Sequence, residues 1–218
     1  LDLVLNTIGR GTHLFFNDGK GHFDSGAALN TGRCGASLAV ADLDGDGDLD
    51  LYVANYRVST VRDDPTGSFR ITQEGGRQRV AAYNGRPTSE PDLVGRFYVT
   101  PGGVRENGEP DVLFLNDGRG GFKPVVWSDG TFMDEDGRAL TAPPYDWGLS
   151  VMARDFTGDG LPDLYVCNDF ESPDRFWINE TRPGGPLRLR AAPFLALRTT
   201  GAFSMGIDGA DVDRDGIW

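Results

Sequence analysis

Residues 42–50 place acidic side chains at alternate positions, a spacing that lets several carboxylates reach one cation. The segment reads Asp-Leu-Asp-Gly-Asp-Gly-Asp-Leu-Asp, with carboxylates at positions 1, 3, 5 and 9 and a backbone carbonyl available at position 7. Oxygen ligands in this number suit Ca²⁺, whereas Mg²⁺ prefers a rigid octahedron that retains water. We therefore predict a Ca²⁺ site formed by Asp42, Asp44, Asp46, Asp48 and Asp50.

The same pattern returns at residues 155–163, with a threonine in place of the acid at position 3. Because the charge of the ligand set tunes Ca²⁺ affinity, this second loop is expected to bind more weakly. Its candidate ligands are Asp155, Thr157, Asp159, Leu161 (through its carbonyl) and Asp163. A third copy begins near the end of the sequence and supplies Asp211, Asp213 and Asp215.

Two other interpretations of these loops compete with a metal site in a β-rich frame. An EF-hand needs a bidentate Glu at position 12 and flanking helices, but position 12 is Val53 in the first loop and Val166 in the second. Both valines lie in strand-like apolar runs, which excludes the EF-hand and a dockerin-like site. The second alternative is a run of solvated turn residues, since Asp and Gly favour turns. Recurrence in register before the same strand-like run favours the metal.

Internal repeats indicate the elements that position these loops. Residues 41–55 recur at 154–168 and begin again at 210–218, and residues 1–6 match the end of the same unit. A second piece, residues 14–23, recurs at 113–122 and in shorter form at 176–180; its Asn-Asp-Gly turn is typical of a hairpin. We predict strands at 37–41, 49–55, 112–115 and 122–126, a four-stranded antiparallel propeller blade.

The repeats divide the chain into an all-β partial propeller of about three blades. The predicted divisions are a partial blade at 1–36, a blade at 37–147, a blade at 148–203 and the start of a fourth at 204–218. The second blade carries an insert at 56–110, between its second and third strands. Inserts in repeat folds often lie on one face and carry binding, although a simple surface decoration fits equally. The repeat starts and stops inside an acidic loop, so we expect a longer protein with further blades.

Composition narrows the class of partner. The chain has 21 Lys and Arg against 33 Asp and Glu, a net charge of −12, which argues against nucleic-acid binding. No apolar stretch is long enough for a transmembrane helix.

The remaining chemistry-bearing residues give weaker signals. His13 and His22 lie on one hairpin without a recognisable nucleophile, so a catalytic triad has little support. Cys34 and Cys167 could form one disulfide or remain buried thiols. Trp147, Phe176 and Trp177 could form a sugar-binding platform, but aromatic residues in blade strands more often belong to the core.

The loops, the strands around them and the Leu-Phe-x-Asn-Asp-Gly hairpin resemble FG-GAP/VCBS repeats, the blades of integrin-α-type β-propellers. Their spelling is most similar to that of the bacterial ASPIC-type secreted relatives of cartilage acidic protein. This resemblance implies a seven-bladed propeller, outside the cell or in its envelope, with Ca²⁺ between the first and second strands of a blade. It also assigns Ca²⁺ to residues 42–50 and 155–163 of this chain.

These observations together predict a calcium-binding scaffold for recognition or adhesion, with structural Ca²⁺, a protein or glycan ligand and no catalytic activity. A lectin-like, carbohydrate-binding propeller is the first alternative. The second is an accessory region of a larger secreted carbohydrate-active enzyme.

Overall fold

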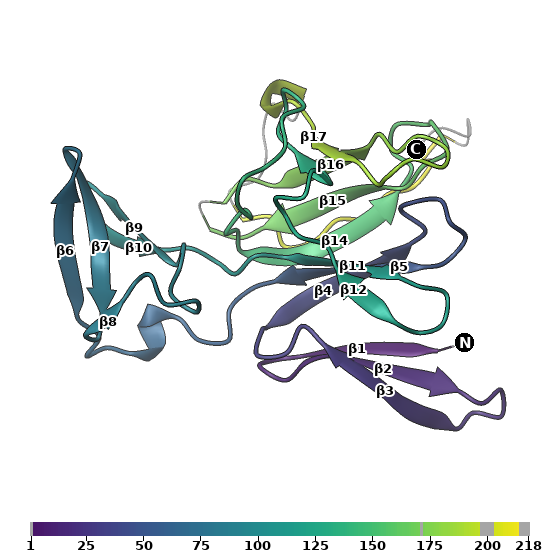
Figure 1. Ribbon diagram of the computed structural model, residues 1–218, viewed down its shortest axis with the longest axis horizontal. Coiled ribbons are helices and arrows are strands. Elements are labelled where there is room, and N and C mark those ends of the chain that lie inside the picture. Colours follow the sequence, from purple (N-terminus) through teal and green to yellow (C-terminus); the bar gives the residue numbers. More distant parts are fainter. Residues whose placement is uncertain (1, 171, 197–202, 214–218) are drawn as a thin grey trace.

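The computed structural model describes residues 2–170, 172–196 and 203–213. In these residues the secondary structure is strand apart from two short 3₁₀ helices, η1 (Val61–Asp63) and η2 (Phe194–Ala196). Three sheets lie side by side, and a smaller body projects from them (Figure 1). The all-β prediction is confirmed, and the sheets have the antiparallel meander expected of propeller blades.

The middle sheet contains the first acidic loop. Its strands are β4 (Gly35–Ala41), β5 (Asp50–Asn55), β11 (Val112–Asn116) and β12 (Phe122–Pro124), hydrogen-bonded in that order. Every residue of β5 is buried, because this strand has a partner on both edges and a neighbouring sheet on each face. We call this sheet the insert-bearing blade, since residues 56–110 separate β5 from β11.

The next sheet repeats the same four-strand meander with a short connection at the same place. Its strands are β14 (Gly148–Arg154), β15 (Asp163–Asn168), β16 (Arg175–Asn179) and β17 (Leu189–Ala191). We call it the short-loop blade. A fifth strand, β13 (Phe132–Met133), pairs in parallel with β17, so this sheet has one more strand than predicted. The ring of Phe132 is fully buried against Trp177, which holds β13 at the sheet edge.

The first sheet has three strands, β1 (Leu3–Thr7), β2 (Gly11–Asn17) and β3 (Phe23–Leu29). They correspond to the second, third and fourth strands of the two blades. Val4 and Leu29 pack onto a buried cluster formed by Leu51, Val53 and Phe114, which joins this sheet to the insert-bearing blade.

A larger apolar cluster joins the insert-bearing blade to the short-loop blade. Tyr52 and Leu113 contribute from the first of these blades, and Leu164, Val166 and Trp177 contribute from the second. The two inner strands, β4 and β14, lie beside each other, and the Val151 amide donates to Ser37 Oγ across the junction at 3.2 Å. Burial of this apolar surface fixes how the two blades stack.

The insert forms a separate small body beside the blades, at the left of Figure 1. It contains a three-stranded sheet of β6 (Phe69–Glu74), β7 (Arg77–Tyr83) and β8 (Arg86–Pro87), and a hairpin of β9 (Phe97–Thr100) and β10 (Gly103–Glu106). The rings of Phe69, Tyr83 and Phe97 pack together with centroids 5.0 to 5.2 Å apart. The insert therefore has its own aromatic core.

Candidate metal centre

The first acidic loop, residues 42–50, joins β4 to β5 and is closed by the carboxylate of its first residue. Asp42 Oδ1 accepts hydrogen bonds from the amides of Gly45 (2.8 Å) and Asp46 (3.1 Å), and Asp42 Oδ2 accepts from Gly47 (3.0 Å). Gly45 and Gly47 have φ of 77° and 96°, a backbone region that residues other than glycine rarely adopt. The two glycines therefore let the chain wrap around Asp42.

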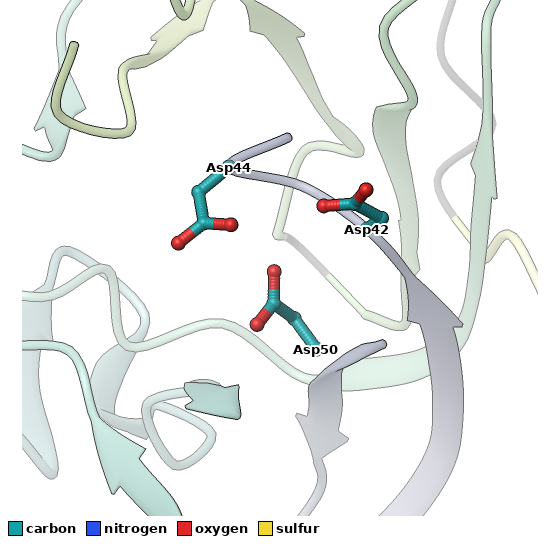
Figure 2. Close-up of side chains that lie close together, drawn as sticks. All are labelled: Asp42, Asp44 and Asp50. Atoms are coloured by element: carbon teal, nitrogen blue, oxygen red, sulfur yellow. The ribbon is translucent and has the colours of Figure 1, made fainter. Parts of the chain in front are cut away.

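Three carboxylates converge inside this loop, from the end of β4, the loop itself and the start of β5. Ligand oxygens of Asp42, Asp44 and Asp50 all lie within 4.8 Å of one another (Figure 2). A set of close carboxylate oxygens is what a hard cation such as Ca²⁺ takes. The arrangement of these three residues fits the predicted metal.

Asp50 is the most buried member of the cluster and ties it to the blade. It is 1% exposed, and its two oxygens accept from the amides of Leu43 and Asn116, both at 3.0 Å. Burial raises the pKa of Asp50 to about 6, against the lowering effect of these two hydrogen bonds. Burial and then the neighbouring Asp46 carboxylate raise the pKa of Asp44. Clustered acids of this kind are stabilised when a cation neutralises them.

The two other candidate ligands in the loop, Asp46 and Asp48, lie outside the group of three converging carboxylates. Asp46 is exposed, and its Oδ1 accepts from the Asp48 amide at 2.9 Å; it is outside the three-carboxylate group. The Asp48 carboxylate lies close to Gly118 in the β11–β12 turn. Ligation by Asp46 and by the Asp48 carbonyl stays a prediction.

The second acidic loop, residues 155–163, has the same backbone hydrogen bonds. Asp155 accepts from the amides of Gly158, Asp159 and Gly160 at 2.7, 3.1 and 2.8 Å. Asp163 accepts from Phe156, Thr157 and Asn179 at 2.9, 3.0 and 2.8 Å. Burial raises the pKa of Asp163.

The two loops differ in how many acids converge. In the second loop the position-3 residue is Thr157, and Leu161 offers only its backbone carbonyl. Within the described residues, a group of three acidic side chains with oxygens inside 4.8 Å occurs in the first loop and not in the second. Metal ligation by the second loop stays a prediction.

The outer copies of the loop are partly visible. Asp2, at position 9, accepts from the Asn17 amide at 2.9 Å, as Asp50 does from Asn116 and Asp163 from Asn179. Asp211 and Asp213 belong to the described segment 203–213, and Asp215 lies outside the described residues. In each of these three sheets the position-9 aspartate thus accepts a hydrogen bond from the asparagine that begins the next hairpin turn.

A second recurring contact, which the sequence analysis missed, holds the opposite end of each blade. In the insert-bearing blade, Asp111 Oδ1 accepts from the Asn55 amide at 2.7 Å, and Asp111 Oδ2 accepts from the Tyr52 hydroxyl at 2.9 Å. The Asn55 side chain donates to the Pro110 carbonyl at 2.8 Å. We call this set the Pro-Asp brace.

The short-loop blade has the same brace. Asp174 accepts from the Asn168 amide at 2.9 Å and from the Tyr165 hydroxyl at 3.1 Å, and the Asn168 side chain donates to the Pro173 carbonyl at 2.7 Å. The signal in the sequence is the dipeptide Pro-Asp just before the third strand of both blades. The metal-ligand spacing does not include these aspartates, because they accept hydrogen bonds from a backbone amide and a tyrosine hydroxyl.

The other candidate residues take structural places. Trp177 is 2% exposed and belongs to the core, so it cannot form an open sugar platform. Trp147 is buried as well, at 5% exposed, and lies at the edge of a groove described below. Cys34 and Cys167 are both buried and free, which decides between the two alternatives for the thiols. His22 is exposed and lies 3.8 Å from Asp24.

No helix in the described part of the chain has the length and apolarity needed to cross a bilayer.

Comparison with known proteins gives one family match, over the N-terminal part of the chain, and two similar curated proteins. Residues 1–53, which include the first sheet and the first acidic loop, match the FG-GAP-like repeat family. Cartilage acidic protein 1 of Homo sapiens is 28% identical over 171 residues, covering 72% of this chain and 24% of the human protein. The Mus musculus protein of the same name is 27% identical over 171 residues. The chain spans 24% of the length of these curated relatives. The resemblance is confirmed to this extent: the chain carries an FG-GAP-like repeat and is similar to cartilage acidic protein 1.

Proposed function

We propose that this chain is part of a calcium-stabilised β-propeller that acts as a recognition or adhesion scaffold outside the cell or in its envelope. The observation that carries the proposal is the convergence of Asp42, Asp44 and Asp50 within 4.8 Å at the corner between β4 and β5. The FG-GAP-like match over the same segment supports it.

Calcium has a structural role in this proposal. When bound, it supplies positive charge that neutralises the three carboxylates. The protein's own part is to hold those carboxylates: Asp42 through the loop amides, and Asp50 through Leu43 and Asn116. Because Asp50 also accepts from Asn116, at the end of β11, an ordered acidic loop also orders the β11–β12 turn.

The partner and the setting belong to the same proposal. We propose a protein or glycan ligand, contact with further blades of the same propeller, and a non-catalytic role. The division into blades at 1–36, 37–147, 148–203 and 204–218 is also proposed, with the observed meanders of the two blades in its support. One strand departs from it: β13, inside 37–147, pairs with β17 of the short-loop blade.

The test is a calorimetric Ca²⁺ titration of the EGTA-stripped chain, with the melting temperature followed with and without metal. A ligand that binds the folded state alone stabilises it, by about 2.7 kcal/mol at a hundredfold excess over Kd. For a chain of this size we expect the melting temperature to rise by roughly 5–10 °C.

A matched pair of variants makes the test specific. Asp44→Asn removes one charge from the cluster and should reduce both the heat of binding and the thermal shift. Asp48→Asn removes an equal charge in the same loop but keeps the carbonyl, and should behave like the wild type. A folded chain, shown by circular dichroism, whose melting temperature ignores Ca²⁺ would refute the proposal, as would equal behaviour of the two variants.

A further inference from the structure

A groove of about 780 Å³ opens where the insert leaves the blades, at the end of β5 opposite to the first acidic loop. Its volume is in the range of ligand-binding pockets, about 300–1,000 Å³. One wall comes from the insert and the other from the residues that flank β14 and β15. Its aromatic lining consists of Tyr56, Tyr98, Tyr145, Trp147, Phe170 and Phe203.

Three of these rings form a continuous packed wall. Trp147 lies between Tyr56, at 4.9 Å between ring centroids, and Phe170, at 5.1 Å. The Tyr56 hydroxyl donates to Asp169 at 3.0 Å, which fixes the orientation of the ring. Phe203 is 64% exposed and continues the wall beyond Phe170, at 6.3 Å. The wall ends in an aromatic side chain that is open to solvent.

The backbone at this wall is strained. Phe170 has φ of 54°, which is rare for a bulky side chain. Strain of this kind persists where surrounding contacts enforce it, and it is enriched at ligand clamps. Here the contacts are the Trp147 ring and the Arg62 guanidinium, whose Cζ lies 5.2 Å from the centre of the Phe170 ring.

Two acids line the groove among the described residues, Glu106 and Asp146, and both are paired with arginines. Glu106 Oε1 accepts from Arg96, and its Oε2 accepts from the Val61 amide at 2.9 Å. Asp146 is ion-paired with Arg175 at 2.7 Å. These two carboxylates therefore add little negative charge to the groove.

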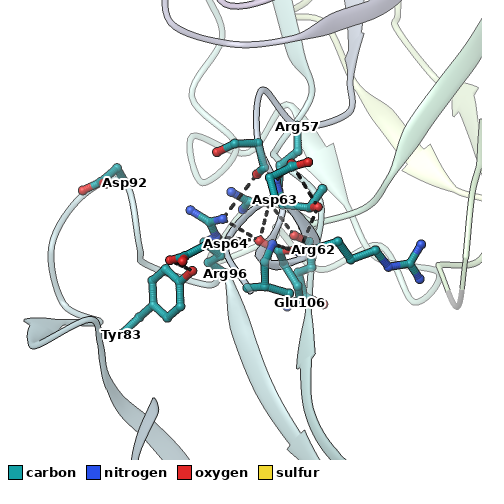
Figure 3. Close-up of polar contacts among 12 residues, drawn as sticks. Arg57, Arg62, Asp63, Asp64, Tyr83, Asp92, Arg96 and Glu106 are labelled. Carbon is teal, nitrogen blue, oxygen red and sulfur yellow. Dashed lines mark hydrogen bonds and ion pairs between the residues drawn. The ribbon is translucent and has the colours of Figure 1, made fainter. Parts of the chain in front are cut away.

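Arg62 differs from these arginines. Figure 3 shows its side chain extending away from the cluster of Arg57, Arg96 and Glu106. Among the described residues no carboxylate pairs with its guanidinium, which contacts the face of Phe170. A cation beside an aromatic wall is thus available in a chain whose net charge is −12. The positive charge of Arg62 favours an anionic group on the ligand.

We propose that this groove binds an anionic oligosaccharide. Sugar rings combine an apolar C–H face, which packs on aromatic rings by dispersion, with hydroxyls that need both donors and acceptors. The lining offers the half-buried rings of Tyr56 and Phe170, packed on the buried Trp147, and the exposed ring of Phe203. Asn107 and Ser172 are available for the hydroxyls. Arg62 binds a carboxylate or sulfate group of the sugar. The inference rests on the recognition role proposed above and names its ligand class.

The test is calorimetric titration of the full chain, in Ca²⁺ buffer, with trigalacturonate and with the neutral trisaccharide galactotriose. We expect trigalacturonate to bind, and galactotriose to bind at least about tenfold more weakly, since hydrogen bonds to charged groups are the stronger ones. Arg62→Gln should weaken trigalacturonate binding at least about tenfold. Phe203→Ala, at an exposed side chain, should weaken both sugars several-fold.

Arg79→Gln is the matched control, because it removes the same charge from the insert at a position 68% exposed and paired with Glu74. It should bind as the wild type does. Equal binding of trigalacturonate by Arg62→Gln and wild type would overturn the inference, and so would absence of sugar binding or preference for a tri-aspartate peptide. If sugar binding fails while Ca²⁺ still raises the melting temperature, the groove assignment alone is wrong.

Discussion

The insert-bearing blade and the short-loop blade have the same contacts at both ends. They differ in the charge of the acidic loop and in the length of the connection between their second and third strands. At one end, the first and the ninth residues of each acidic loop accept the loop amides. At the other end, each Pro-Asp brace closes the connection between the second and third strands. The contacts of the ninth residue and of the brace satisfy buried or partly buried backbone groups, which any blade must do. These shared contacts hold the two ends of each blade together.

The differences lie outside these shared contacts. The first loop has Asp44 where the second has Thr157, and the brace spans 56 residues in one blade and 6 in the other. The charge at the loop and the length of the connection have therefore diverged without changing the contacts that hold the blade. We infer that metal affinity and ligand binding are concentrated where the two blades differ.

The largest expected effect is the loss of a position-9 aspartate. Asp50→Ala and Asp163→Ala each leave buried or partly buried amides without a hydrogen-bond acceptor. Each should destabilise the chain by roughly 2–4 kcal/mol. In EGTA, Asp163→Ala should cost at least as much, because Asp163 serves three amides and Asp50 two. Denaturant unfolding measures both.

Calcium should reverse that order. In Ca²⁺ buffer, Asp50→Ala also loses the metal-dependent stabilisation and becomes the more damaging of the two changes. Asp24→Ala, at an exposed side chain of β3, is the control and should stay within about 0.5 kcal/mol of the wild type. An unchanged order with and without Ca²⁺ would show that Asp50 acts on the backbone alone.

An exchange of the position-3 residues should alter metal binding by a smaller amount. Asp44→Thr gives the first loop the composition of the second at this position, and should weaken Ca²⁺ roughly tenfold. Thr157→Asp adds a fourth carboxylate to the second loop and should strengthen binding there by a similar factor. Calorimetric titration resolves the two changes. If neither variant alters Ca²⁺ affinity, position 3 does not explain the difference between the loops.

The brace of the insert-bearing blade should give stability a pH dependence. Burial raises the pKa of Asp111 to about 7, against an unfolded value near 4. The unfolded chain then loses this proton first, so stability from this group is greatest below pH 4, falls by at most about 1.4 kcal/mol per pH unit up to pH 7, and is flat above.

Asp111→Asn removes this ionisation and should flatten the fall between pH 4 and 7. Unfolding free energies measured across that range, for wild type and variant, give the difference directly. Asp24→Asn is the control at an exposed carboxyl. A parallel pair of curves for wild type and Asp111→Asn would contradict the expected ionisation.

The sequence predicts the blades well because their signals are local. The strands expected at 37–41, 49–55 and 112–115 correspond to β4, β5 and β11, since apolar runs and Asn-Asp-Gly turns act over a few residues. The two-residue strand β13 has no such pattern, and it forms because Phe132 packs against Trp177. A local sequence pattern cannot predict a strand that depends on a contact with a residue so distant in the chain.

The site divides in the same way. The convergence of Asp42, Asp44 and Asp50 follows from spacing along one loop, so the sequence predicts it. The aromatic groove brings together residues as distant as Tyr56 and Phe170, whose rings lie 6.3 Å apart. The brace likewise joins Asn55 to Asp111 across the insert. Such pairs depend on tertiary packing. For the groove no spacing in the chain predicts them, and for the brace the sequence signal is the repeated Pro-Asp dipeptide.

The smallest expected effect on folding and Ca²⁺ binding comes from removing the insert, which is the largest difference between the two blades. Residues 56–110 can be replaced by a copy of residues 169–173, which carry the short connection of the other blade and its proline. Because the brace that closes the connection is shared, the chimera should fold and bind Ca²⁺ within about threefold of the wild type. Circular dichroism and Ca²⁺ titration measure these two properties.

The same chimera should lose trigalacturonate binding, because Arg62 and the insert wall of the groove are gone while Asp42, Asp44 and Asp50 remain. Asp111→Ala in the chimera is the control for the brace: it removes the acceptor of Asn55 and Tyr52 and should prevent the closed connection. A chimera that fails to fold would show that the insert supports the blade, and its role would then be structural as well as ligand-binding.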